Sequence, residues 1–425
     1  MSSKPGIDRN NAVSVFLMGA LPAVGGSAIS ILLGVFFVWA ILSLLMRRFE
    51  FSMSHSDMRL ACSFSAFPVL VLLTALAGEH PGTGALKSLL LLPFLSLWVM
   101  IPRLRAGRGN YIPHYVCGAA CGAIGAIVFA TFQWAFPMRP EGGAGNPAVF
   151  AIMVLALTAV ASLNITARNP IMKGLSWAGV LAGLSSVVIA LVRGVWIATV
   201  FIVAGIFSYA PQQFKKPAVL WSAAAVLAFI VVSVVLVAPS FPSFTKNFIH
   251  SASSLSRIFL NLDSETGVQS VDLRIDMWSG AWRAILDSPW TGYGIQNGMD
   301  AVRAHLPADV AEKIIFTHAH NGFLTFALDG GIVLLGSVIA MLVMPVVIAW
   351  KAPRDETHRK RLFLALLVSA VYALCGMTQI MFRHDIMDSF FIFNTIIVAA
   401  SIPSRAVMGV ETENLTRLDT RQEDD

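Results

Sequence analysis

The chain has 425 residues, of which 56% are hydrophobic and 13% are charged, and its mean hydropathy is +0.72. A soluble domain has about 45–50% apolar and about 25% charged residues, so this composition excludes an ordinary soluble protein. The net charge of +6 gives no reason to expect nucleic-acid binding, because the placement of the cations has another explanation, given below.

Apolar runs recur from the N-terminus almost to the end, and each can cover about 30 Å of hydrocarbon as a helix. Residues 12–46 are too many for one span and break near Pro22–Gly26, which predicts two short helices there. The first run lacks a convincing small-residue cleavage site, so we expect it to remain as a span. The other predicted spans are 60–77, 86–101, 112–136, 148–166, 171–191, 195–209, 218–238, 322–350, 362–381 and 386–402.

These spans predict an all-α polytopic membrane protein with about twelve transmembrane helices and one large, partly helical loop. Residues 1–238 hold about nine spans, 239–321 form the loop, 322–402 hold about three spans, and 403–425 form a polar tail.

The distribution of lysine and arginine orients the predicted spans. With the N-terminus in the cytoplasm, 20 cations fall on the inner side and 4 on the outer side, leaving the large loop aside. The positive-inside rule therefore places both termini in the cytoplasm and the large loop outside.

Familiar soluble-enzyme motifs are missing from the sequence, which contains no Walker, dinucleotide-binding or Cys/His zinc pattern. The four cysteines lie in apolar runs, so we expect no disulfide framework. Enzymes acting on membrane-borne substrates, secondary transporters and scaffolds remain as alternatives.

Two short polar sites interrupt apolar runs on the predicted outer side. Arg193-Gly194 is expected to form a tight turn between two helices, because an arginine at the bilayer centre costs about 2.5–3.5 kcal/mol. The alternative is an arginine that snorkels to the lipid headgroups from a helix end. Arg383-His384-Asp385 either adds charge to the same site or caps helices, and we favour the cap.

Residues 272–286 of the large loop have helical periodicity. Trp278, Ala281, Trp282 and Ile285 fall on one predicted apolar face with Arg274 on or beside it. The helix should stop before Pro289, where Gly292 and Gly294 supply a turn. This helix could either present Arg274 to a functional site or be a plain interfacial anchor with its tryptophans at headgroup level.

The sequence His318-Ala319-His320-Asn321 comes directly before the span at 322–350. No third ligand has suitable spacing, so we expect no metal ion and no other cofactor. A histidine at the membrane–water boundary is either structural or a general base with a pKa near neutrality.

Taken in order, these elements resemble the bacterial O-antigen ligase / O-antigen polymerase superfamily. The resemblance lies in the Arg-Gly turn, the Arg-x-x-x-Trp-x-x-Ala-Trp helix leading to Asp-Ser-Pro-Trp-x-Gly-Tyr-Gly, and His-x-His-Asn before a helix with two glycines. Members often have serine before the first arginine, where this chain has Val192.

The resemblance implies a GT-C-like, inverting and metal-independent glycosyltransferase of the bacterial inner membrane with a periplasmic active site. Its donor would be a glycan on undecaprenyl diphosphate and its acceptor lipid A-core. Arg193 and Arg274 match the diphosphate-binding arginines and His320 the essential histidine, while His318, Asn321 and Arg383 would be supporting or substrate contacts. A polymerase and a protein O-oligosaccharyltransferase share these features, so the acceptor stays open, as does the oligomeric state.

A lipid-linked glycan flippase is the alternative from another class. It predicts ionisable residues at the midplane of two related halves. The predicted spans are instead poor in Asp and Glu, and polar residues gather near the loop. We therefore favour the transferase, with a ligase as its most specific form.

Overall fold

The computed structural model describes residues 5–77, 81–107, 109–136, 140–215, 265–295 and 297–403, and these are helical or irregular with no strand. Seven described helical stretches are long and apolar enough to cross a membrane. The protein is therefore an all-helical, multi-pass membrane protein. The predicted span 218–238 and the tail from 404 onward lie outside the described residues.

The first half of the bundle follows the predicted spans closely. The break predicted near Pro22–Gly26 is confirmed, because one helix ends at Ala20 and the next begins at Ala28. The helices of this half are α1 (Pro5–Ala20), α2 (Ala28–Leu45), α3 (His55–Ala77), α4 (Pro81–Ser88), η1 (Leu89–Ser96), α5 (Leu97–Arg105), α6 (Ile112–Ala135), η2 (Gly142–Ala144), α7 (Pro147–Ala161), η3 (Ser162–Asn164), α8 (Pro170–Ile189), α9 (Arg193–Tyr209) and α10 (Pro211–Phe214).

The span predicted over 86–101 is not one regular helix. The chain passes from α4 through the 3₁₀ segment η1 into α5, and Pro93 lies inside that segment. Proline lacks the N–H group that a regular α-helix would use at this position, which accounts for the interruption.

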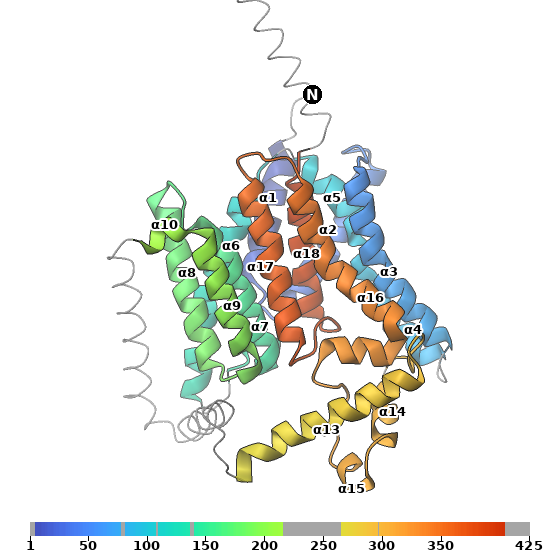
Figure 1. Ribbon diagram of the computed structural model, residues 1–425. Coiled ribbons are helices and arrows are strands. Elements are labelled where there is room, and N and C mark those ends of the chain that lie inside the picture. The colour runs from blue at the N-terminus through green and yellow to red at the C-terminus, as the bar shows by residue number, and fades with distance from the viewer. Residues whose placement is uncertain are drawn as a thin grey trace, which may run out of the picture.

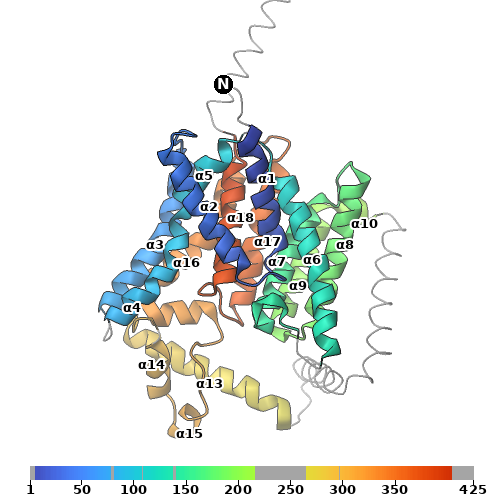
Figure 2. The same ribbon diagram turned by 180° about the vertical axis from the view of Figure 1, so that it is seen from behind.

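The described loop and the last spans form the second half. Its helices are α13 (Glu265–Asp287), α14 (Gly298–Ala304), α15 (Ala308–Ala311), α16 (Gly322–Lys351), α17 (His358–Gly376) and α18 (Asp385–Ala400). Figures 1 and 2 show α13, α14 and α15 at the end of the bundle opposite the N-terminus. The loop helices therefore form one end of the molecule.

Helix α18 is the centre of the bundle and appears in the middle of both views (Figures 1 and 2). Its residues from Ile386 to Ala399 are all buried. Phe382, just before it, and Phe391 within it join an aromatic cluster with Phe67 and Tyr372. The core thus extends from the spans to the turn that precedes α18.

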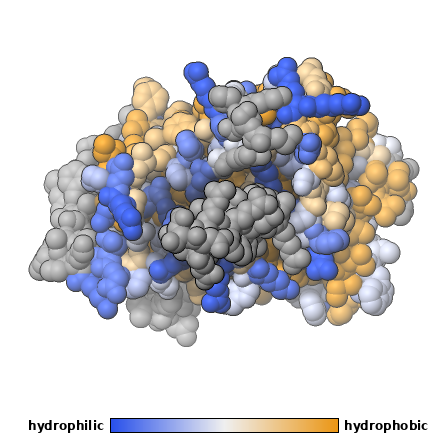
Figure 3. Space-filling view, turned by 90° about the horizontal axis from the view of Figure 1, so that it is seen from above, coloured by the Kyte–Doolittle hydropathy of each residue, from blue (hydrophilic) through white to orange (hydrophobic). Residues whose placement is uncertain are grey.

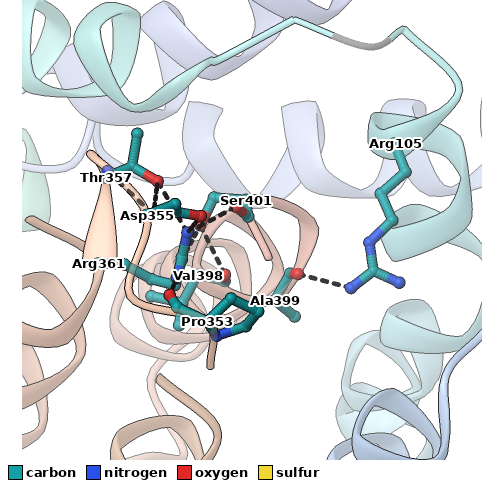
Figure 4. Close-up of polar contacts among 8 residues, drawn as sticks. All are labelled: Arg105, Pro353, Asp355, Thr357, Arg361, Val398, Ala399 and Ser401. Atoms are coloured by element: carbon teal, nitrogen blue, oxygen red, sulfur yellow. Dashed lines mark hydrogen bonds and ion pairs between the residues drawn. The ribbon is translucent and has the colours of Figure 1, made fainter. Parts of the chain in front are cut away.

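The opposite end of α18 is held by two arginines (Figure 4). Arg105 donates to the Ala399 carbonyl at 2.7 Å, and the fully buried Arg361 donates to the Ser401 carbonyl at 3.0 Å and to Asp355 at 2.7 Å. Cations at a helix C-terminus satisfy its free carbonyls and its negative dipole end.

The N-terminal end of the bundle carries hydrophilic side chains, with hydrophobic residues on its flanks (Figure 3). Arg47 and Arg48 are exposed there just after α2, and Arg59 is exposed in the first part of α3. Exposed arginines are therefore found at this end of the bundle, and the loop helices lie at the other end.

Candidate functional site

Helix α13 carries Arg274 on the side that faces the His318–Asn321 turn. Trp278, one helical turn after Arg274, donates its indole N–H to the Ala319 carbonyl at 2.8 Å. Met277 and Ala281 are fully buried in a small core with α14 and α16. These contacts fix the rotation of α13 relative to the two histidines.

The predicted apolar face of this helix is partly wrong. Trp278, Ala281 and Ile285 do pack into the small core, but Trp282 is 58% exposed and lies on another side of the helix. The predicted end of the helix is confirmed, since α13 stops at Asp287, and Gly292 and Gly294 have positive φ values of 60° and 82°.

The turn from His318 to Asn321 is tightly folded. The backbone N–H of His320, which has a φ of 48°, donates to Nδ1 of His318 at 3.1 Å, and the two rings meet edge to face at 4.4 Å. Phe316 packs on His320 with ring centroids 4.5 Å apart. His318 therefore holds the backbone that carries His320.

Asn321 has a structural role that sequence reasoning did not assign. Its side-chain oxygen accepts from the Leu324 N–H at 3.2 Å and so caps the N-terminus of α16. The N–H of Gly322 donates to the Gln379 carbonyl at 3.0 Å. The turn is thereby fixed both to α16 and to the segment before α18.

The surroundings of the two imidazoles disfavour their charged forms. Burial, followed by the charges of His318 and Arg274, lowers the pKa of His320 to about 4. Burial, followed by the charge of Arg383, lowers the pKa of His318. Nδ1 of His320 is buried and has no hydrogen-bond partner among the described residues.

Arg383 reaches the site from the turn before α18. Its guanidinium forms an ion pair with Asp329 of α16 and lies 5.5 Å above the Phe326 ring. His384 occupies the N-cap position of α18 without a side-chain capping hydrogen bond, and Arg383 lies one residue before it. The alternative, in which Arg383 adds charge beside the histidines, describes its position better.

Asp329 is a site residue that sequence reasoning missed. It is only 3% exposed and lines a small recess together with His318. An acidic residue inside an apolar span is itself a signal for function or pairing, and Asp329 stands in the span predicted at 322–350. The other residues lining the recess are Gly298, Met299, Thr317, Ala319, Thr325 and Leu328.

A kink at Gly330 and Gly331 joins α16 to the turn after α13. The kink frees the Leu328 and Asp329 carbonyls, which accept from the N–H groups of Tyr293 and Gly294 at 2.8 and 2.9 Å. Gly331 has a φ of 65°, and a Cβ added there would lie 2.3 Å from the Trp290 carbonyl. Only glycine fits this joint, which ties α13 to α16.

The structure describes the backbone at Arg193, whereas the Arg193 side chain lies outside the described residues. The predicted turn falls just before it, with Leu191 at a φ of 53°, and Arg193 begins α9. Thr378 donates to the Gly194 carbonyl at 3.0 Å, and the next residue, Gln379, binds Gly322. The start of α9 and the start of α16 are therefore linked through one short segment.

The described residues contain no group of three or more His, Cys, Asp or Glu side chains arranged to hold a metal ion. The site instead combines neutral imidazoles with guanidinium groups. This arrangement suits the binding of an anion next to a proton acceptor.

Comparison with known families agrees with this geometry. Residues 178–339, which run from α8 into α16, match the family model described as O-antigen ligase. Over these residues the chain is similar to that family. The match covers Arg193, Arg274, His318 and His320 and confirms the resemblance predicted from the motifs. No curated protein matches the chain.

Proposed function

We propose that this protein is a membrane glycosyltransferase that moves an O-antigen glycan from undecaprenyl diphosphate to lipid A-core. The observation that carries the proposal is the meeting of Arg274, Arg383 and the His318–His320 pair at the loop end of the bundle. Of these residues, Arg274 and the two histidines lie within the family match. The similarity of residues 178–339 to the O-antigen ligase family supports a chemistry of glycan ligation or polymerisation.

The arginines would bind the diphosphate of the donor. A guanidinium keeps its charge at every working pH and offers paired N–H groups that match phosphate oxygens. Arg274 supplies one such group, and Arg193 is expected to supply another. Arg383 would add charge at the same end, although its contact with Asp329 already offsets part of it.

His320 would act as the general base of a single displacement. The acceptor hydroxyl loses its proton to His320 as its oxygen bonds to the anomeric carbon, and the bond to the diphosphate oxygen breaks with the electron pair. Attack from the face opposite the leaving group inverts the anomeric centre. His318 would keep the backbone of His320 in place, as its hydrogen bond supports.

The low pKa of His320 fits this role if donor binding is considered. In the free protein, burial and the His318 and Arg274 charges lower that pKa. A bound diphosphate would offset the arginine charge and raise the pKa toward neutrality. The donor would then strengthen the base at the moment when it is needed.

The proposed location is the bacterial inner membrane, with both termini in the cytoplasm and the site on the periplasmic face. The exposed arginines at the N-terminal end and the loop helices at the other support this orientation through the positive-inside rule. About twelve spans and a GT-C-like architecture are part of the same proposal.

Reconstitution tests the proposal directly. Purified protein in proteoliposomes receives a lipid-linked glycan, with or without lipid A-core, and EDTA is present throughout. Glycan on lipid A-core supports the ligase, lengthened lipid-linked glycan indicates a polymerase, and inhibition by EDTA contradicts the metal-independent mechanism. Donor that only changes leaflet would support the flippase instead.

A further inference from the structure

Helix α13 has a second apolar surface, separate from the one buried against α14. Ile275, Trp282 and Leu286 are 57%, 58% and 61% exposed, and Trp290, just beyond the helix, is 69% exposed. At about 100° per residue, the first three lie within about 40° of one line along the helix. We call these four residues the exposed stripe.

The exposed stripe continues onto the surface of a membrane span. The Ile332 N–H donates to the Pro289 carbonyl at 2.8 Å, which holds Trp290 against the kink of α16. Ile332 and Val333 are 56% and 47% exposed on a helix that is long and apolar enough to cross a bilayer. Trp290 therefore lies next to the exposed apolar residues at the start of the second part of α16.

The charged residues of α13 lie beside the exposed stripe and not within it, as expected if lipid covers the stripe. Arg283 and Asp287 are exposed and occupy the helix sector beside the stripe, where water can reach them. Arg274 falls about 100° away on the other side, toward the histidines. Tryptophan favours the boundary between headgroups and acyl chains, where its ring is apolar and its N–H is wet.

We propose that the exposed stripe lies in the membrane, at the headgroup–acyl boundary of the leaflet next to the site. Lipid is the occupant that the contact with α16 favours, because Ile332 and Val333 are exposed on a helix that is long and apolar enough to cross a bilayer. The stripe would then set the depth of Arg274 at the level where the phosphates of a membrane-borne donor lie. This last consequence rests on the proposed function, whereas the contact with lipid does not.

Spin-label depth measurement on the full chain tests this proposal. In a variant with the four native cysteines replaced by serine or alanine, single cysteines at 275, 282 and 286 carry a nitroxide. Cysteines at the neighbouring positions 283 and 287 are the matched controls. The proteoliposomes contain phosphatidylethanolamine and phosphatidylglycerol.

We expect the three stripe positions to collide readily with oxygen and to be protected severalfold from a water-soluble nickel chelate, relative to the two controls. Equal exposure of all five positions to nickel would overturn the proposal. Labels at the stripe that are immobilised and shielded from both reagents would also overturn it, because they would indicate a protein contact. Native-like circular dichroism is required of every labelled variant.

The same samples separate this proposal from the proposed function. Lipid contact at the stripe without any glycan transfer by the unlabelled protein would refute the function and leave the stripe intact. Transfer with a water-exposed stripe would refute only the membrane contact.

Discussion

The acid limb of the pH–rate profile offers a detailed test of the role of His320. A free histidine with a pKa of about 6.5 is only about one quarter neutral at pH 6. His320, with a pKa of about 4, is about 99% neutral at the same pH. The value of kcat/KM reports the free enzyme, so its acid limb should lie well below pH 6.

Two comparisons sharpen this prediction. Arg274→Gln removes one of the charges that depress the pKa of His320, so the acid limb of its residual kcat/KM should move to higher pH than in wild type. Arg274→Lys keeps the charge and should leave the limb in place, although the bidentate contact is lost. In wild type, the limb in kcat should lie above the limb in kcat/KM, because bound diphosphate raises the pKa of His320.

Initial rates of glycan transfer in proteoliposomes, measured from about pH 3 to about pH 8 at varied donor concentration, give both limbs. A limb in kcat/KM near pH 6.5 would refute the environment assigned to His320. Identical limbs in wild type and Arg274→Gln would refute its electrostatic coupling to Arg274.

The other predictions concern the supports of the site and of the bundle. A residue with a Cβ at positive φ costs roughly 1–2 kcal/mol, and Gly331→Ala should destabilise the protein by more than this because the new Cβ also meets the Trp290 carbonyl. Gly336→Ala, with open space around it, should be neutral or stabilising in the same thermal melt. Arg383→Gln removes the guanidinium that pairs with the buried Asp329 and should lower the free energy of unfolding by about 3–5 kcal/mol. Adding Asp329→Asn to this variant should recover part of that loss. If the two substitutions lower stability additively, the pairing is contradicted. Arg361→Met should lower the free energy of unfolding by about 1–3 kcal/mol, because its contacts at the end of α18 are lost. Arg354→Met, on the exposed surface, should change that free energy by less than about 0.5 kcal/mol. Equal melting temperatures of the two variants would argue that the Arg361 contacts do not stabilise α18.

Hydropathy and breaker residues were sufficient to predict most of the helices. The break before α2, the end of α13 before Pro289 and the positive-φ glycines after it depend on local backbone rules, which act within a few residues. The motif order was sufficient to predict the similarity of residues 178–339 to the O-antigen ligase family.

Long-range packing set the limits of prediction. Periodicity shows that Trp278 and Trp282 are both apolar positions, but only tertiary contacts decide that one binds Ala319 and the other stays exposed. Nothing in the sequence indicates that the kink of α16 accepts hydrogen bonds from Tyr293 and Gly294. Nor does it indicate that Asp329 forms an ion pair with Arg383 of the turn before α18. The convergence of the Arg193 side chain with this site stays a prediction.

The most direct test of the central claim is the transfer rate of the His320→Ala variant. Initial rates of glycan transfer from undecaprenyl diphosphate are compared with wild type at pH 7 in EDTA, on protein with an unchanged melting temperature. We predict a loss of about 10²–10⁴-fold, the range typical for removal of a general base. A variant that transfers glycan within a few fold of the wild-type rate would contradict the assignment of His320 as the base.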